Sequence, residues 1–167
     1  MIIIQNGQLV SPSGLTRADL ALDGGRIAAI EPHIEPGEGD TVHDAAGCYV
    51  FPGFIDGHTH LDMESGSLVT ADDFTTGTRA AVCGGTTTIV DFATQDKGGT
   101  LNDALDAWHK KADGKCSCNY AFHMAITDWN DQVKAELPEM FRRGVTSFKA
   151  YMAYDALKVN DAELLEI

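Results

Sequence analysis

The chain has 167 residues, 44% of them hydrophobic and 22% charged, a composition that fits a folded protein and excludes collagen, low-complexity disorder and a small disulfide scaffold. Twelve Lys and Arg against 25 Asp and Glu leave a net charge of −13, and a surface of that sign repels nucleic-acid phosphates and anionic lipid headgroups. We therefore expect no nucleic acid and no membrane as partners, and the lack of any apolar run near the ~20 residues that span a bilayer favours a cytoplasmic protein.

Residues 1–50 carry the pattern of a hairpin-rich β region. Short aliphatic runs predict strands at 2–4, 20–22, 26–30 and 48–50. Asp23-Gly24-Gly25 lies between the second and third runs and is typical of a tight hairpin turn. We treat this segment as a domain separate from the rest of the chain.

From residue 51 onward, short apolar runs alternate with stretches of helical period, the pattern of parallel strands joined by crossover helices. Glycines at 84, 85 and 144 lie where helices are expected to end, and Asn160 is placed to cap a fourth helix. Four βα units make half of an eight-stranded barrel, so we expect an α/β fold in which 51–167 form the first half of a (β/α)8 TIM-type barrel, within a longer enzyme. The predicted strands are 54–58, 87–92, 120–126 and 146–152, and the predicted helices are 72–83, 101–111 and 132–142.

Two histidines, His58 and His60, stand two residues apart at the end of the first predicted barrel strand. Because side chains alternate along a strand, both imidazoles face one side, and barrel folds place their active sites at the carboxyl ends of their strands. Two imidazoles that converge on one point suit a metal ion. The alternative is a chance pair on a half-exposed strand, but the position after the β-rich segment, with Asp56 just ahead, favours metal binding.

Lys149 lies in the middle of the fourth predicted strand, where a buried ammonium would be costly. One interpretation is a lysine whose ammonium extends to solvent at the end of the strand. The other is that its neutral amine adds carbon dioxide to form a carbamate, an anionic ligand able to bridge two metal ions. The residues alone leave both interpretations open.

Three separated segments follow one another along the chain: Ile55-Asp56-Gly57-His58-Thr59-His60-Leu61-Asp62, Gly84-Gly85-Thr86-Thr87-Thr88 and Ser147-Phe148-Lys149-Ala150-Tyr151-Met152. Together they resemble the cyclic amidohydrolases, most closely the dihydropyrimidinase and D-hydantoinase branch. The resemblance covers essentially the whole chain and implies a small β-sandwich domain before the barrel. It also implies two zinc ions, one bound by His58 and His60, with carboxylated Lys149 bridging both. Tyr154 matches the family tyrosine, catalytic and substrate-binding, that donates to the substrate carbonyl and the developing oxyanion.

The same resemblance implies a reaction and an assembly. The expected reaction is hydrolytic ring opening of cyclic amides, namely 5,6-dihydropyrimidines such as dihydrouracil, and hydantoins, by a hydroxide shared between the two metal ions, as in pyrimidine catabolism. A homotetramer is expected. The family's two further histidine ligands and its catalytic aspartate would lie beyond Ile167, so residues 1–167 alone are expected to be inactive.

Two alternatives stay open within this resemblance. One is an allantoinase- or dihydroorotase-like enzyme, although Asp62 stands where those enzymes typically carry arginine or asparagine and would repel the carboxylate of dihydroorotate. The other is a non-catalytic adaptor of the dihydropyrimidinase-related family, whose members have lost metal ligands that this chain keeps. The loop 63–68 departs from the Pro-Phe-Gly-Gly type of many hydantoinases, which favours small or polar rings over phenyl-substituted ones.

Three further residues are weaker candidates. His123 lies in an apolar strand and is interpreted as a core histidine. Asp56 and Asp91, at strand ends, are either partners that orient the ligating groups or ordinary polar contacts.

Overall fold

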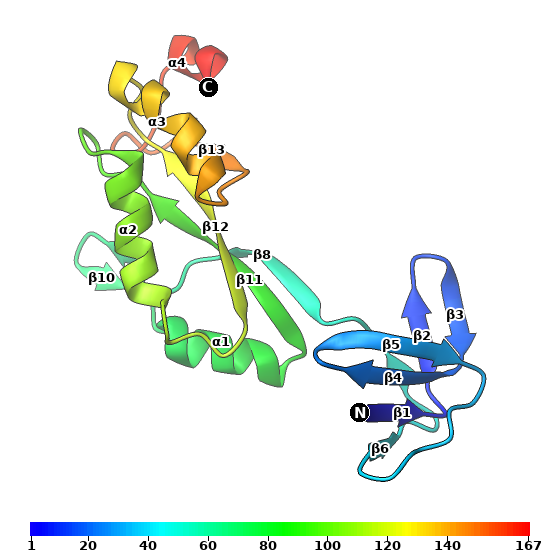
Figure 1. Cartoon of the computed structure of the whole chain (residues 1–167). Helices are drawn as coiled ribbons and strands as arrows, with labels where there is room; N and C mark the ends of the chain where they lie inside the picture. The colour runs from blue at the N-terminus through cyan, green and yellow to red at the C-terminus, as the bar shows by residue number, and fades with distance from the viewer. The chain divides into compact units, whose positions relative to one another are not determined.

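The computed structural model describes all 167 residues, which form two compact units, Met1–Pro52 and Gly53–Ile167 (Figure 1). The N-terminal unit holds a four-stranded sheet in the order β5-β4-β1-β6 and a three-stranded sheet in the order β3-β2-β7. The four strands predicted for this region are confirmed, whereas three others, β2, β3 and β6, were not predicted. The strands are β1 (Ile2–Gln5), β2 (Gln8–Ser11), β3 (Gly14–Arg17), β4 (Asp19–Asp23), β5 (Arg26–Glu31), β6 (Thr41–Asp44) and β7 (Tyr49–Val50).

The β4–β5 turn and a buried carboxylate organise the N-terminal unit. Gly24 and Gly25 both have positive φ, 53° and 75°, as a two-residue hairpin turn with the twist of its strands requires. Asp19, only 3% exposed, accepts hydrogen bonds from the backbone N–H groups of Asn6 (2.8 Å) and Ile34 (2.9 Å). These two bonds, followed by a weaker one from His33, hold the pKa of the Asp19 carboxyl below its usual value.

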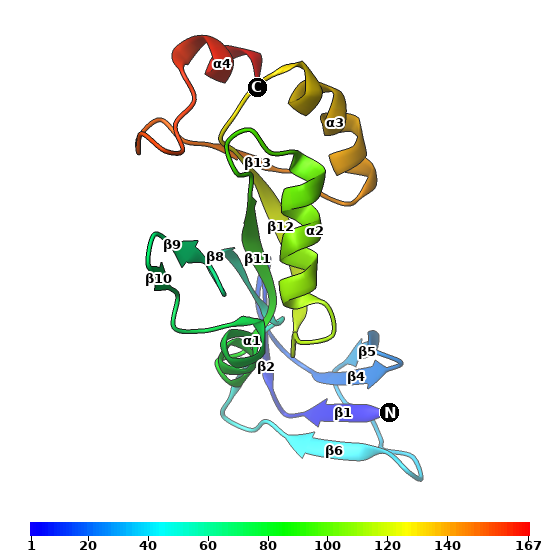
Figure 2. The same ribbon diagram turned by 90° about the vertical axis from the view of Figure 1, so that its left-hand side faces the viewer.

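The second unit is built on one parallel sheet in the order β13-β12-β11-β8, with helices in the connections (Figures 1 and 2). This is the order of four successive strands of a (β/α)8 barrel. A small antiparallel hairpin, β9–β10, follows β8 and was not predicted. The elements are β8 (Phe54–Thr59), β9 (Glu64–Ser65), β10 (Leu68–Val69), α1 (Phe74–Cys83), β11 (Thr86–Thr94), α2 (Leu101–Ala112), β12 (Asn119–Ile126), α3 (Asp131–Arg142), β13 (Phe148–Ala150) and α4 (Asp161–Glu166).

Each helix starts at a side chain that accepts hydrogen bonds from its first turn. Asp73 caps α1, Thr100 caps α2, Asn130 caps α3 and, as predicted, Asn160 caps α4. The predicted helices agree with α1, α2 and α3 to within two residues at either end. The fourth barrel strand is shorter than the predicted 146–152, because the chain leaves the sheet after residue 150 and makes only an isolated bridge to Lys158.

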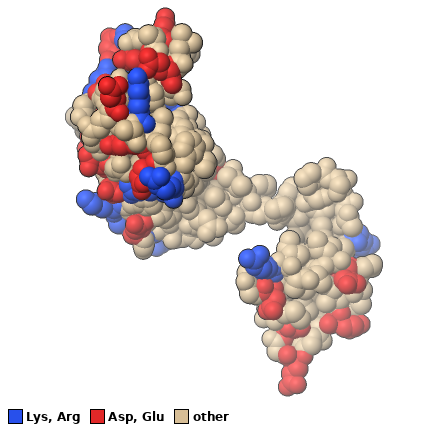
Figure 3. Space-filling view, turned by 45° about the horizontal axis from the view of Figure 1, so that its top comes forward, with Lys and Arg blue, Asp and Glu red and all other residues tan.

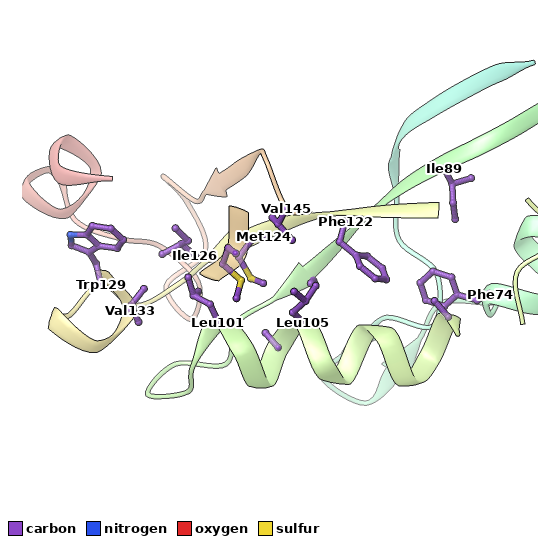
Figure 4. Packing of buried hydrophobic residues seen from close by; sticks show 14 residues of the cluster. Phe74, Ile89, Leu101, Leu105, Phe122, Met124, Ile126, Trp129, Val133 and Val145 are labelled. Carbon is purple, nitrogen blue, oxygen red and sulfur yellow. The ribbon is translucent and has the colours of Figure 1, made fainter. Parts of the chain in front are cut away.

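The hydrophobic core of the second unit lies between the sheet and the helices (Figure 4). β12 contributes alternate residues, α2 contributes one face, and α1 and α3 close the two ends, so only one face of the sheet is covered. The fully buried members include Phe74, Ile89, Leu101, Leu105, Met124, Ile126, Val133 and Met140.

The pairing of β8 with β11 contains a register shift that affects the side chains on the face of the sheet not covered by helices. Asp56 lies opposite Ile89 and Thr59 opposite Asp91, so β8 holds one extra residue in this interval. Such a β-bulge bends the strand and re-aims the neighbouring side chain, here His58. The backbone N–H of His58 donates to the Asp56 carboxylate at 3.1 Å, which closes the bulge.

On the face shown in Figure 3, charged side chains of both signs lie on both units, and over the whole chain Asp and Glu outnumber Lys and Arg, 25 to 12. None of the helices has the length and apolar character needed to cross a membrane.

Candidate metal centre

The uncovered face of the parallel sheet carries the two histidines of the His-x-His pair. His58 extends from the bulge of β8, and His60 follows directly after the strand. Their Nε2 atoms lie 3.2 Å apart, and their rings are nearly perpendicular, at 83°. The two imidazoles therefore converge on one point instead of stacking side by side.

The spacing of these two nitrogens fits a shared metal ion. Two nitrogens bound to one tetrahedral zinc at ~2.0–2.1 Å lie about 3.3 Å apart, close to the observed separation. Two imidazoles are only part of a four-coordinate shell, and nowhere in the 167 residues do three or more His, Cys, Asp or Glu side chains gather as a metal group would require. The residues present thus fit half of a metal shell.

The surroundings of His60 favour the neutral form of its imidazole, the form that binds metal. Burial lowers the pKa of its imidazole, the charges of Lys149 and His58 lower it further, and the charge of Asp91 opposes them. A lowered pKa keeps the ring neutral, and a neutral imidazole is the metal ligand. Its Nδ1 is buried without a hydrogen-bond partner, so Nε2 is the only one of its nitrogens that meets another polar group.

Phe92 of β11 is the centre of this face and was missed by the sequence reasoning. Its ring centroid lies 4.6 Å from that of His58, 5.1 Å from that of His60 and 4.8 Å from that of His123. The His60 ring is stacked on it, at an interplanar angle of 29°. The phenyl ring is 6% exposed, so it forms a rigid apolar support under three imidazoles.

Lys149 of β13 also meets Phe92. Its Nζ lies 4.3 Å from the centroid of the Phe92 ring and 4.6 Å from that of Tyr151. The half-buried ammonium makes no ion pair with any acidic side chain of the chain, and aromatic faces are its only charge partners. The sheet thus brings Lys149 to the same ring as both histidines.

His123 links three strands on this face. One ring nitrogen, Nδ1, contacts Ser147 Oγ just before β13, and the other, Nε2, lies 3.0 Å from the carbonyl oxygen of Gly57 in β8. It therefore joins the strand that carries His58 to the strand that carries Lys149. Both ring nitrogens of His123 have partners, but the interpretation of it as a core histidine is wrong in its place, because the ring is only partly buried and lies on the uncovered face of the sheet.

The remaining sequence candidates lie around this group. Tyr154 is 73% exposed in a left-handed conformation (φ 69°), and its ring meets that of Tyr151, not either histidine of the pair. Asp56 bonds the backbone of His58. Asp91 is fully buried on the helix-covered side of β11 and accepts four hydrogen bonds.

Comparison with known proteins gives one family. The model of the amidohydrolase family matches residues 49–166. The chain is 48% identical over 164 residues to D-hydantoinase of Geobacillus stearothermophilus, covering 97% of this chain and 35% of that protein. It is 43% identical over 168 residues to dihydropyrimidinase of Dictyostelium discoideum, covering 99% and 33%. A crystal structure of dihydropyrimidinase from Brevibacillus agri matches with a TM-score of 0.94 at 44% identity, covering 98% of this chain and 36% of that one.

These matches extend over both units, and the likeness in structure confirms the predicted fold class, the first half of a TIM-type barrel preceded along the chain by a small β domain. The chain spans about a third of the length of the curated relatives it matches.

Proposed function

The chain belongs to the amidohydrolase family, and on that premise we propose that it is the N-terminal part of a metal-dependent hydrolase that opens cyclic amides. The names of its relatives point to hydantoins and dihydropyrimidines, rings that share one reacting group, an amide C–N bond within the ring. The observation that carries the proposal is the 3.2 Å between Nε2 of His58 and Nε2 of His60. It leaves two ring nitrogens aimed at one point on the open face of a parallel sheet.

His58 and His60 would hold one zinc ion of a pair, and Lys149 would bridge both ions as a carbamate. When bound, such a pair supplies an activated water near neutral pH and polarises the substrate carbonyl. For the carbamate, the ammonium of Lys149 would first lose one proton, and the neutral amine would then form a bond to the carbon of carbon dioxide and release a second proton. This exchanges an ammonium that lacks an acidic partner for an anion that the metal charge neutralises, which supports the assignment.

Tyr154 would donate its hydroxyl hydrogen to the carbonyl oxygen of the substrate, where negative charge develops. Its ring is exposed and its hydroxyl has no hydrogen-bond partner within the chain, so the donor is available. The proton needed by the departing ring nitrogen would come from an aspartate outside these 167 residues.

The test is metal content and turnover of the full-length protein. His58→Ala and His60→Ala should each lower bound zinc from about two ions per subunit and abolish ring opening of dihydrouracil and hydantoin. His43→Ala, which removes an exposed histidine of the N-terminal unit, is the matched control and should change neither. A wild-type protein without zinc or turnover would point to an adaptor, and retained ring opening in both variants would remove these histidines from the site.

The substrate would be a small or polar ring. The hairpin β9–β10, which follows His60, presents Glu64 and Ser65 at its surface beside Leu68 and Val69. We propose that this hairpin would line the substrate pocket. A pocket contact discriminates by only ~1–3 kcal/mol, so we expect dihydrouracil to exceed phenylhydantoin in kcat/KM by a modest factor. Dihydroorotate should be the poorest substrate because Asp62 repels its carboxylate. A clear preference for dihydroorotate would overturn this choice of branch.

A further inference from the structure

Asp91 is a buried carboxylate that the proposed chemistry does not use. It is 0% exposed and lies on β11, on the side of the sheet that faces the helices. A buried carboxylate is tolerated only where hydrogen bonds satisfy it, and Asp91 has four donors within 3.2 Å. Where those donors come from decides what the carboxylate holds together.

One oxygen of Asp91 accepts hydrogen bonds only from the segment that carries His60. Oδ2 accepts from the hydroxyl of Thr59 at 2.8 Å and from the backbone N–H of Leu61 at 2.8 Å. These two residues flank His60 on either side. The segment on both sides of this imidazole is therefore anchored to a single atom in the core.

The other oxygen accepts from different parts of the fold. Oδ1 accepts from the backbone N–H of Phe92 at 2.7 Å and from the indole N–H of Trp108, on α2, at 3.2 Å. Phe92 is the residue on which the His60 ring stacks. One carboxylate thus bonds the backbone on both sides of His60 and the backbone N–H of Phe92, and ties both segments to α2 through Trp108.

We propose that Asp91 is a positioning residue for the metal centre, which sets the direction of the His60 imidazole through the backbone on both sides of it; this rests on the proposed function only in taking His60 as a metal ligand. Partners that orient ligands in this way typically change metal affinity by about 10–100-fold when removed. If the carboxylate had a purely structural role, its removal would lower the stability of the fold and leave metal affinity unchanged.

The four donors separate the two roles, because single hydrogen bonds can be removed from opposite sides of the same carboxylate. Thr59→Val removes the hydroxyl donor beside His60 and keeps the side-chain shape. Trp108→Phe removes the donor from α2 and leaves the β8 end untouched. Asp91→Asn places an amide NH2, itself a donor, against one of the two donor pairs.

The experiment measures zinc affinity of the full-length protein by competition with a chelator, and the visible spectrum of the cobalt-substituted protein, alongside the midpoint of urea unfolding. We expect Thr59→Val and Trp108→Phe to lower the midpoint to a similar extent. Only Thr59→Val, and more strongly Asp91→Asn, should weaken zinc binding, by about 10–100-fold, and shift the cobalt bands.

Two results would overturn the inference, and neither depends on turnover. One is zinc affinity in Thr59→Val equal to that of the wild type; because this variant preserves shape, it gives an answer even where Asp91→Asn fails to fold. The other is an equal loss of affinity in Trp108→Phe, which would show that the carboxylate acts through stability alone. A wild-type protein that binds no zinc would overturn the proposed function itself, and with it this role for Asp91.

Discussion

Replacing Phe92 with leucine tests whether the aromatic ring supports the metal centre. The variant keeps an apolar side chain at a site that is 6% exposed, but it removes the ring contacts with His58, His60 and His123. It also removes the aromatic face below the ammonium of Lys149.

The expected losses of stability and of zinc affinity follow from these contacts. Each ring pair contributes ~0.5–1.5 kcal/mol beyond buried area, and pairs that share one ring are not additive, so we expect Phe92→Leu to lower the free energy of unfolding by about 2–3 kcal/mol. Releasing the two imidazoles adds the cost of ordering them again when metal binds. At ~0.5–1.5 kcal/mol for each side chain, zinc affinity should fall by about 5–150-fold.

Phe122 provides a matched control on the neighbouring strand. It is 5% exposed and also contacts three rings, those of Phe74, His109 and Tyr120, but on the helix-covered face. Phe122→Leu should therefore reduce stability to a similar extent and leave zinc affinity unchanged. Urea unfolding and chelator competition on the full-length protein measure the two quantities. Equal zinc affinities in the two variants would refute the role assigned to the Phe92 ring.

Three further outcomes follow from burial and charge. Burial raises the pKa of the Cys116 thiol to about 11, so at pH 8 iodoacetamide should label it far more slowly than exposed Cys48, as peptide mass spectrometry would detect; equal rates would contradict this. Because the pKa of Asp19 is lowered in the folded state, its contribution to stability is present at neutral pH and lost as the pH falls below about 4; urea unfolding from pH 3 to 7 should show a flatter acid response in Asp19→Asn than in the wild type. Leu105→Ala, at a fully buried site, should cost ~2–5 kcal/mol by the same assay, against ~0.5 kcal/mol or less for Leu165→Ala, at a site that is 89% exposed.

Long elements of this fold were predictable because their signals are local. The strand predicted at 120–126 is observed as Asn119–Ile126, and the helix predicted at 101–111 as Leu101–Ala112. Short polar strands carry no such signal. β6 has a single aliphatic residue, Val42, and exists because it pairs in parallel with β1, a contact between distant segments that no local pattern encodes.

The candidate site likewise has one feature with a local sequence signal and one that depends on contacts between distant segments. The spacing of His58 and His60 predicted that both would face one side of the sheet, and they do; the bulge in β8 that brings their Nε2 atoms to 3.2 Å was not predictable from that spacing. The position of Phe92 under them was not predictable. Residues 89–93 are largely apolar, as in parallel strands buried on both faces, so only the pairing with β8 and β12 shows which of them lies beneath the imidazoles.

The extra residue in β8 has a consequence for anyone who would transplant the His-x-His pair into another protein. On a regular strand, the side chains of residues two positions apart leave the backbone in parallel directions, and their rings would not cross at 83° with their Nε2 atoms 3.2 Å apart. Here the three-residue interval from Asp56 to Thr59 in β8 lies opposite the two-residue interval from Ile89 to Asp91 in β11. The side chain of His58 therefore extends from a bent part of the backbone, whereas His60 follows Thr59, which is again paired with β11. A graft must therefore carry the kink along with the two histidines, and a scaffold whose first strand is straight will display the motif without its geometry.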